Sequence, residues 1–209
     1  MAQTLYLWDL ANTLFPERWD SERSGVPSYD AYVEALGYDL ETITPHDYEW
    51  AYERPYKDGL FVLSIADGFR EVLTWTKNNA VFTTGNREQV DWRAEQLHKK
   101  YDFDIRDYIK EICSTFDFGN TNRKTKDMLE NILDKKYREG FRVAVYTDDN
   151  LGNCEFFIAA ATDFARLTPD FHFRIYRMMN DNKGLRPKDG YCEIGTLYDL
   201  QKNEQKILN

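Results

Sequence analysis

Residues 4–9 read Thr-Leu-Tyr-Leu-Trp-Asp, a short and mostly apolar run that ends abruptly on a carboxylate. A similar arrangement returns at residues 143–149, which read Val-Ala-Val-Tyr-Thr-Asp-Asp. Brief apolar runs of this kind are typical of strands that are buried on both faces of a parallel sheet. The two segments therefore predict two buried strands, each followed by acidic side chains.

Helical patterns separate these strands from further ones. Predicted helices cover residues 66–76, 87–100, 126–137, 153–166 and a closing segment near Thr196, and further predicted strands cover residues 80–82, 108–115 and 171–178. Strands that alternate with helices predict a doubly wound, mostly parallel α/β sheet covered on both faces. The mostly polar residues 201–209 are expected to form a frayed, solvated end.

Residues 17–61 differ in character from the rest of the chain. They are polar and rich in tyrosine, and Pro27, Pro45 and Pro55 break them into short helical stretches. We therefore expect two domains: an α/β core of residues 1–16 and 62–209, and a small helical cap of residues 17–61.

Composition limits the classes of partner. The chain has 209 residues and a formal net charge of -9, so it repels nucleic-acid phosphates and anionic membrane surfaces. We expect no nucleic-acid partner and no membrane partner; the sequence does not indicate an oligomeric state. Its three cysteines are scattered and form neither a disulfide framework nor a zinc motif. No apolar run approaches the roughly 18–20 residues of a membrane span and no signal peptide is apparent, so a cytoplasmic location is expected.

Polar side chains follow three of the predicted strands directly or within a residue. These side chains are Asp9, Thr83 and the pair Asp148-Asp149. Ligands of parallel sheets sit beyond the carboxyl ends of the strands, where these side chains would meet. Carboxylates in such a group repel one another unless a cation intervenes, and oxygen ligands suit Mg²⁺ together with a substrate phosphate. A lysine ahead of the last strand, Lys124 or Lys126, could add positive charge.

The order of these segments resembles that of the haloacid-dehalogenase (HAD) superfamily. Residues 8–15, Trp-Asp-Leu-Ala-Asn-Thr-Leu-Phe, resemble its first motif, an apolar strand followed by D-x-D-x-T-L. Residues 81–86 are similar to the second motif, residues 123–129 to the third and residues 143–149 to the fourth, and residues 194–200 are similar to the family's tail. The inserted segment stands where the family places a C1-type cap.

The resemblance implies a phosphoryl-transfer site. Asp9 would be the nucleophile that becomes an aspartyl-phosphate. Thr83, with the backbone N–H of Thr84, would hold the transferring phosphoryl group, and Lys124 would neutralise the developing charge. Lys124 fits the third motif better than Lys126 does.

The resemblance also implies a cofactor and its ligands. Mg²⁺ would be bound by Asp9, the backbone carbonyl of Ala11, Asp148 and Asp149, the last directly or through water. Arg87, just beyond the second motif, could reach a substrate phosphate. The implied function is Mg²⁺-dependent hydrolysis of a small phosphorylated substrate, of the phosphatase or phosphonatase type.

Position 11 departs from the family pattern, because most family phosphatases carry a second aspartate there. That residue protonates the leaving group and then activates water, and such assistance is worth about 10²–10⁴-fold in rate. Ala11 can do neither, although its carbonyl remains.

Three interpretations of Ala11 stay open. In the first, the chain resembles phosphonoacetaldehyde hydrolases, which share D-x-A-x-T, and Lys57 forms a Schiff base with the substrate. In the second, a group of the substrate or a cap carboxylate replaces the missing acid; the candidates are Asp47, Glu49, Glu53 and Asp58. In the third, the domain is catalytically silent and binds a phosphorylated ligand or a protein. Alteration of an original aspartate at position 11 is a related possibility. The identity of the substrate depends on the cap, where no motif is recognisable.

Overall fold

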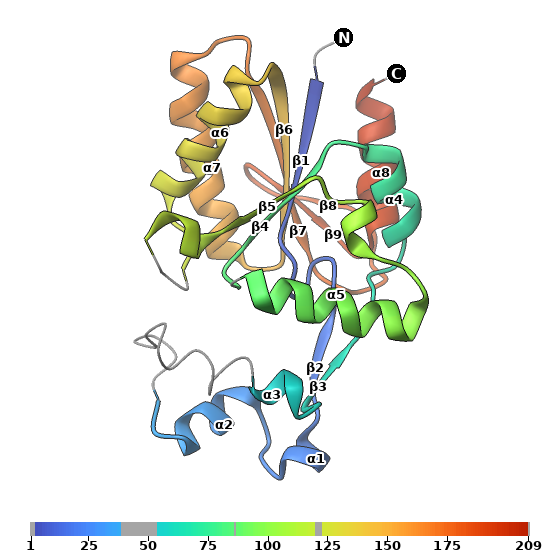
Figure 1. Cartoon of the computed structure of the whole chain (residues 1–209). Coiled ribbons are helices and arrows are strands. Elements are labelled where there is room, and N and C mark those ends of the chain that lie inside the picture. Colours follow the sequence, from blue (N-terminus) through green and yellow to red (C-terminus); the bar gives the residue numbers. More distant parts are fainter. Residues whose placement is uncertain (1–2, 39–53, 86, 120–122, 209) are drawn as a thin grey trace.

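The computed structural model describes residues 3–38, 54–85, 87–119 and 123–208. Its centre is a seven-stranded sheet with the strand order β5-β4-β1-β6-β7-β9-β8 (Figure 1). Neighbouring strands are parallel except for the last pair, β9 and β8. In sheet order the strands span Glu111–Ser114, Asn79–Thr83, Gln3–Trp8, Phe141–Asp148, His172–Met178, Cys192–Ile194 and Arg186–Pro187.

Helices cover both faces of this sheet, as Figure 1 shows. One face carries α6 and α7, which span Lys126–Arg138 and Leu151–Leu167. The other carries α4, α5 and α8, which span Phe69–Thr76, Arg87–Tyr101 and Leu197–Leu208. Two 3-10 helices, Ile105–Asp107 and Thr115–Phe118, flank β5. The predicted doubly wound, mostly parallel α/β fold is therefore confirmed.

Strand β1 shows why the sheet needs helices on both sides. Leu5 and Leu7 enter the core under α6 and α7, whereas Tyr6 and Trp8 enter the core under α4, α5 and α8. Successive side chains of a strand point to opposite faces, so an uninterrupted apolar run must be covered twice. The same run delivers Asp9 to the carboxyl edge of the sheet.

The C-terminal region differs from the sequence-based expectation. The short strands β8 and β9 were not predicted, and the expected frayed end is wrong, because α8 continues to Leu208. Its Glu204 is fully buried and accepts hydrogen bonds from Arg174 at 2.6 and 2.5 Å and from the Tyr176 hydroxyl at 2.7 Å. These partners lie on β7, so a polar sequence here conceals an anchored helix.

The inserted segment leaves the core through a two-stranded antiparallel ribbon. β2 (Glu17–Trp19) pairs with β3 (Phe61–Leu63), which brings the two ends of the segment together. Its described helices are short and comprise α1 (Ser21–Ser24), α2 (Tyr29–Ala35) and α3 (Arg54–Lys57).

A buried cluster joins this ribbon to the core. Arg93 of α5 donates to Glu17 at 2.8 Å and to the Tyr56 hydroxyl at 2.6 Å, and Tyr56 donates to Glu17. Removing one partner from a buried ion pair is costly, so the cluster holds the base of the segment against α5. The assignment of residues 17–61 as a cap remains a prediction.

Candidate active site

The loop after β1 turns sharply. The backbone N–H of Asn12 donates to the carbonyl of Phe15 at 2.9 Å, and the N–H of Phe15 donates to the carbonyl of Leu10 at 2.8 Å. Asn12 takes a left-handed conformation with φ 54°, which asparagine tolerates better than most residues. Thr13 is fully buried inside the turn. The turn keeps Asp9 and Ala11 beside the ends of the neighbouring strands.

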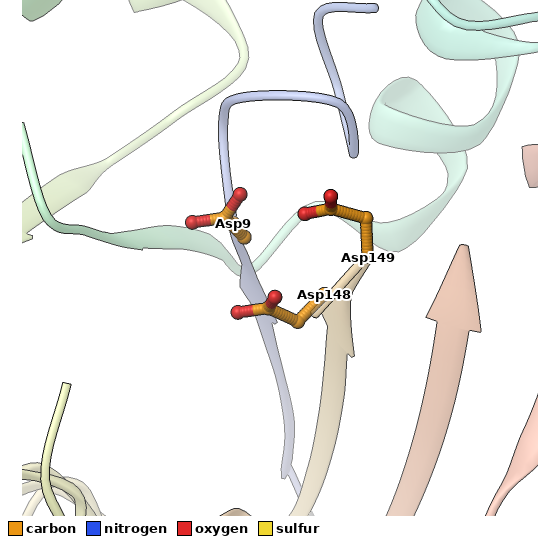
Figure 2. A group of neighbouring side chains, drawn as sticks. All are labelled: Asp9, Asp148 and Asp149. Atoms are coloured by element: carbon orange, nitrogen blue, oxygen red, sulfur yellow. The ribbon is translucent and has the colours of Figure 1, made fainter. Parts of the chain in front are cut away.

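Three carboxylates meet at this edge of the sheet. One oxygen from each of Asp9, Asp148 and Asp149 lies within 4.8 Å of the others. Figure 2 shows Asp9 at the end of β1 and the other two at the end of β6, with all three carboxylates turned toward one space. β1 and β6 are parallel neighbours, and the N–H of Asp9 donates to the carbonyl of Thr147 at 2.8 Å.

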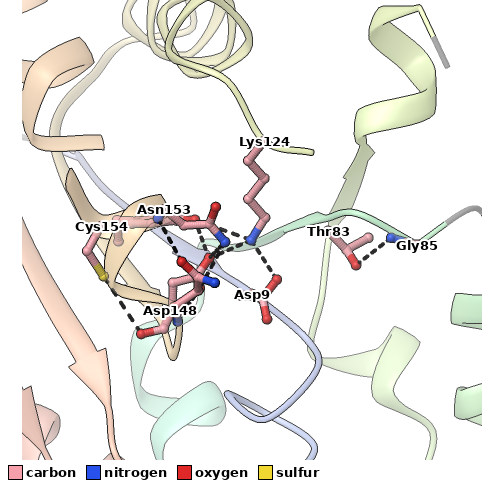
Figure 3. Close-up of polar contacts among 9 residues, drawn as sticks. Asp9, Thr83, Gly85, Lys124, Asp148, Asn153 and Cys154 are labelled. Carbon is pink, nitrogen blue, oxygen red and sulfur yellow. Dashed lines mark hydrogen bonds and ion pairs between the residues drawn. The ribbon is translucent and has the colours of Figure 1, made fainter. Parts of the chain in front are cut away.

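Lys124 is the basic side chain of this group. Its ammonium donates to Asp9 Oδ1 at 2.5 Å and to Asp148 Oδ2 at 2.6 Å, and its side chain is 0% exposed (Figure 3). Lys126, its rival in the sequence, instead pairs with Asp163 and with Glu130 at the surface. The structure thus brings Lys124, and not Lys126, to the carboxylates.

The shared environment shifts the pKa of several groups. Burial raises the pKa of Asp9 to about 7, and the charges of Asp148 and Asp149 add to this effect while Lys124 opposes it. Burial and the neighbouring Asp148 raise the pKa of Asp149 to about 6. Burial alone would lower the pKa of Lys124, but Asp148 and Asp9 outweigh it and raise that pKa above its ordinary value. The carboxylates therefore carry an electrostatic strain that a bound cation would relieve.

The arrangement fits a magnesium ion. Mg²⁺ takes six oxygens at about 2.0–2.1 Å, which places ligand oxygens roughly 2.9–4.2 Å from one another. The three carboxylate oxygens lie within 4.8 Å, only slightly wider than that. Oxygen-only donors and a partly open cavity suit Mg²⁺, which keeps several waters and accepts a substrate phosphate.

Asp148 is the most firmly held of the carboxylates. Its Oδ1 accepts from the N–H of Asn150 at 2.8 Å, and the Asn153 amide donates to both of its oxygens at 3.2 and 3.1 Å. The Tyr146 hydroxyl donates to Oδ2 at 2.5 Å. No sequence motif pointed to Tyr146 or Asn153. Tyr146 precedes Asp148 by two residues, so the strand period already places both on one face.

Thr83 ends β4, the other neighbour of β1, and Thr84 follows it directly. The buried Thr83 hydroxyl accepts a hydrogen bond from the N–H of Gly85 at 3.1 Å (Figure 3). A Cβ at Gly85 would lie 2.7 Å from Gln89 Oε1, so a larger residue in this turn would have to displace the Gln89 side chain. Thr84 lines the same cavity as Asp9.

This cavity has a volume of about 550 Å³ and opens above the carboxylates. Its lining includes Ala11 as well as the three carboxylates and Lys124, with Asn153 on one wall. Arg123 and the half-exposed ring of Phe156 also contribute to it. The volume falls within the range of small-molecule sites.

Two predicted substrate-binding residues lie elsewhere. Arg87 lines a different cavity and pairs with Asp117 at 3.3 Å. Lys57 is exposed on α3, and the described lining of the Asp9 cavity does not include it. Neither side chain is brought to Asp9, and the roles assigned to them stay predictions.

The proposed replacements for the missing acid are mostly outside the described residues. Asp47, Glu49 and Glu53 belong to the part of the chain that the structure does not describe. Asp58 is exposed and pairs with Arg54 at 3.5 Å.

Comparisons with known proteins bear on the fold. No protein-family model matches the sequence, and no curated protein is similar enough to match it. A solved structure of the HAD-family enzyme bt-2542 from Bacteroides thetaiotaomicron is 12% identical, with a TM-score of 0.51, over 85% of this chain and 95% of that one. A magnesium complex of the same enzyme has the same identity and TM-score, over 84% of this chain and 93% of that one. The likeness shows that this chain has a HAD-like fold. Within the described ranges, no helix is both long and apolar enough to cross a membrane.

Proposed function

We propose that this chain is a HAD-like, Mg²⁺-dependent hydrolase that acts on a small phosphorylated substrate through an aspartyl-phosphate at Asp9. The observation that carries the proposal is the buried ammonium of Lys124, held between Asp9 and Asp148 where two parallel strands end. Placing three carboxylates and a lysine together is costly for a fold unless the group serves a ligand.

The chemistry follows from the positions of these side chains. A carboxylate oxygen of Asp9 attacks phosphorus, so that a bond from Asp9 to phosphorus forms as the bond to the leaving group breaks. Water then attacks the aspartyl-phosphate, which releases phosphate and restores the carboxylate. Lys124 favours the ionised form of Asp9, against the effect of burial, and balances the negative charge that develops on the phosphoryl oxygens.

Two further groups complete the proposed site. Asp9, Asp148, Asp149 and the carbonyl of Ala11 would hold Mg²⁺, which when bound polarises the phosphoryl oxygens and offsets their charge. Thr83, with the N–H of Thr84, would orient the phosphoryl group. The magnesium complex of the fold neighbour bt-2542 is consistent with this assignment.

A second candidate function rests on Ala11. Among the described residues that line the cavity, the acids are Asp9, Asp148 and Asp149, and the proposal already uses all three. A domain without an acid for the leaving group could bind a phosphorylated ligand, or a partner protein, without releasing product.

The test is a screen of phosphate esters and phosphonates with the unaltered chain in Mg²⁺ and in EDTA, repeated with Asp9→Asn. We expect turnover that needs both Mg²⁺ and Asp9. The matched control is Asp163→Asn, which removes a surface carboxylate paired with Lys126 and should leave turnover unchanged. Equal turnover in Asp9→Asn would refute the mechanism. A beryllofluoride complex that needs Mg²⁺ and Asp9, without turnover of any substrate, would instead favour the binding domain.

A further inference from the structure

The hydroxyl of Tyr146 contacts both the Lys124 ammonium and the Asp148 carboxylate at the centre of the site. It donates to Asp148 Oδ2 at 2.5 Å and accepts a hydrogen bond from the Lys124 ammonium at 3.2 Å. No residue-level motif in the sequence pointed to it. The hydroxyl is the third acceptor of Lys124, after Asp9 and Asp148.

Packing fixes where this hydroxyl lies. Tyr146 is on β6 and is 0% exposed. Its ring stacks on Phe157 of α7 with the centroids 4.5 Å apart and the planes 3° from parallel. Close packing on all sides restricts the movement of a stacked, fully buried ring, so the hydroxyl is held in place before any ligand binds.

The Tyr146 hydroxyl completes the set of hydrogen-bond acceptors around the Lys124 ammonium. An ammonium has three N–H donors, and Lys124 has three acceptors in Asp9, Asp148 and Tyr146. Loss of the hydroxyl would leave one donor facing a phenyl ring and would remove a donor from Asp148. Asp148 would keep its hydrogen bonds from Asn150, Asn153 and Lys124, but its Oδ2 would lose the hydroxyl donor, and the Lys124 ammonium would lose one of its three fixed acceptors.

We propose that Tyr146 is a positioning residue that holds Asp148 and Lys124 in the geometry needed for magnesium binding and phosphoryl transfer. The inference rests on the proposed function, because it assigns Asp148 to the metal. Groups that hydrogen-bond to metal ligands typically change metal affinity or activity by about 10–100-fold when they are removed.

The experiment is calorimetric titration of Tyr146→Phe with MgCl₂, without substrate. We expect the dissociation constant for Mg²⁺ to rise by about 10–100-fold. The matched control is Tyr176→Phe. Tyr176 is also buried, on the next strand, and also donates to a buried carboxylate, that of Glu204. Both variants should lose similar thermal stability, whereas only Tyr146→Phe should lose magnesium affinity.

Two results would overturn the role of Tyr146: unchanged or tighter Mg²⁺ binding by Tyr146→Phe, or an equal loss of affinity in Tyr176→Phe. If the unaltered chain binds no Mg²⁺ at all, the metal site of the proposed function fails and this inference fails with it. For any substrate that is turned over, we expect kcat at saturating Mg²⁺ to fall more than KM rises, because the misplaced Lys124 acts on the transition state.

A second variant covers the case in which Tyr146→Phe does not fold. Phe157→Leu keeps the hydroxyl but loosens the ring that carries it, because the stacking partner becomes smaller. We expect weaker Mg²⁺ binding in this variant as well. Unchanged binding in folded Phe157→Leu would contradict the claim that packing of the ring positions the hydroxyl.

Discussion

Replacing Lys124 with methionine should destabilise the metal-free protein strongly. The substitution keeps most of the side-chain length and removes the charge. Lys124 Nζ lies 2.5 Å from Asp9 and 2.6 Å from Asp148, with no exposed side-chain surface. Two buried carboxylates would lose their counter-charge, and breaking a buried pair in this way costs about 3–5 kcal/mol. For a protein of this size that loss lowers Tm by roughly 6–20 °C.

Magnesium should reverse part of this loss. A cation bound by the same carboxylates supplies the missing positive charge, and a ligand that binds only the folded state stabilises it by mass action. The assay is scanning calorimetry at pH 7.5, first in EDTA and then in a series of Mg²⁺ concentrations. We expect Mg²⁺ to raise the Tm of Lys124→Met by more than that of the unaltered chain.

Lys126→Met is the matched control for this experiment. The Lys126 side chain is 38% exposed and pairs with Asp163 and Glu130, and surface pairs of this kind contribute little to stability because water and salt screen them. Its Tm should therefore change by less than about 4 °C. If the Tm of Lys124→Met also fell by less than about 4 °C, or if both variants lost the same amount of Tm, the electrostatic account of the site would be refuted.

Three further predictions concern chemistry, pH and packing. Ala11→Asp should raise turnover of alkyl phosphates by about 10²–10⁴-fold. The gain should be much smaller for aryl phosphates, because their leaving groups need no proton. Equal gains for both classes would show that residue 11 does not act as the acid. The pKa of Asp9 rises to about 7 and that of Asp149 to about 6 from an ordinary value of 3.8, so the folded state holds more protons than the unfolded state between about pH 4 and 7. Their contribution to the stability of the metal-free protein is therefore greatest near pH 4 and is lost as pH rises to 7. Thermal denaturation in EDTA should show this decline, and Mg²⁺ should stabilise more at pH 7.5 than at pH 5.5; the opposite pH trend in Mg²⁺ stabilisation would contradict it. Gly195→Ala would place a Cβ 1.9 Å from the carbonyl oxygen of Asp181. Urea denaturation should therefore show that the free energy of unfolding falls by about 1–3 kcal/mol or more. An unchanged urea midpoint would mean that the loop containing Asp181 moves away freely.

The regular part of the fold could be predicted because its signals are local. The apolar run before Asp9 must be buried on both faces, and the helical stripes that follow provide that cover. Strand β9 and its antiparallel partner β8 gave no comparable signal, because they are only three and two residues long. A closing helix near Thr196 was predicted, but its continuation to Leu208 was not, because burial of Glu204 depends on Arg174 and Tyr176, which are distant in sequence.

From the sequence alone, the strand ends indicated that Asp9, Asp148 and Asp149 would gather at one edge, because parallel strands present their carboxyl ends together. Only the tertiary structure decided how charge is distributed there. It placed Lys124 between two carboxylates and Lys126 at the surface. It also brought the Tyr146 hydroxyl within hydrogen-bonding distance of both Lys124 and Asp148. It also placed Arg87 beside Asp117 in a separate cavity. Sequence patterns report which way a backbone segment faces, whereas ion pairs depend on distances between side chains that are far apart in the chain, and these distances exist only after the sheet has formed.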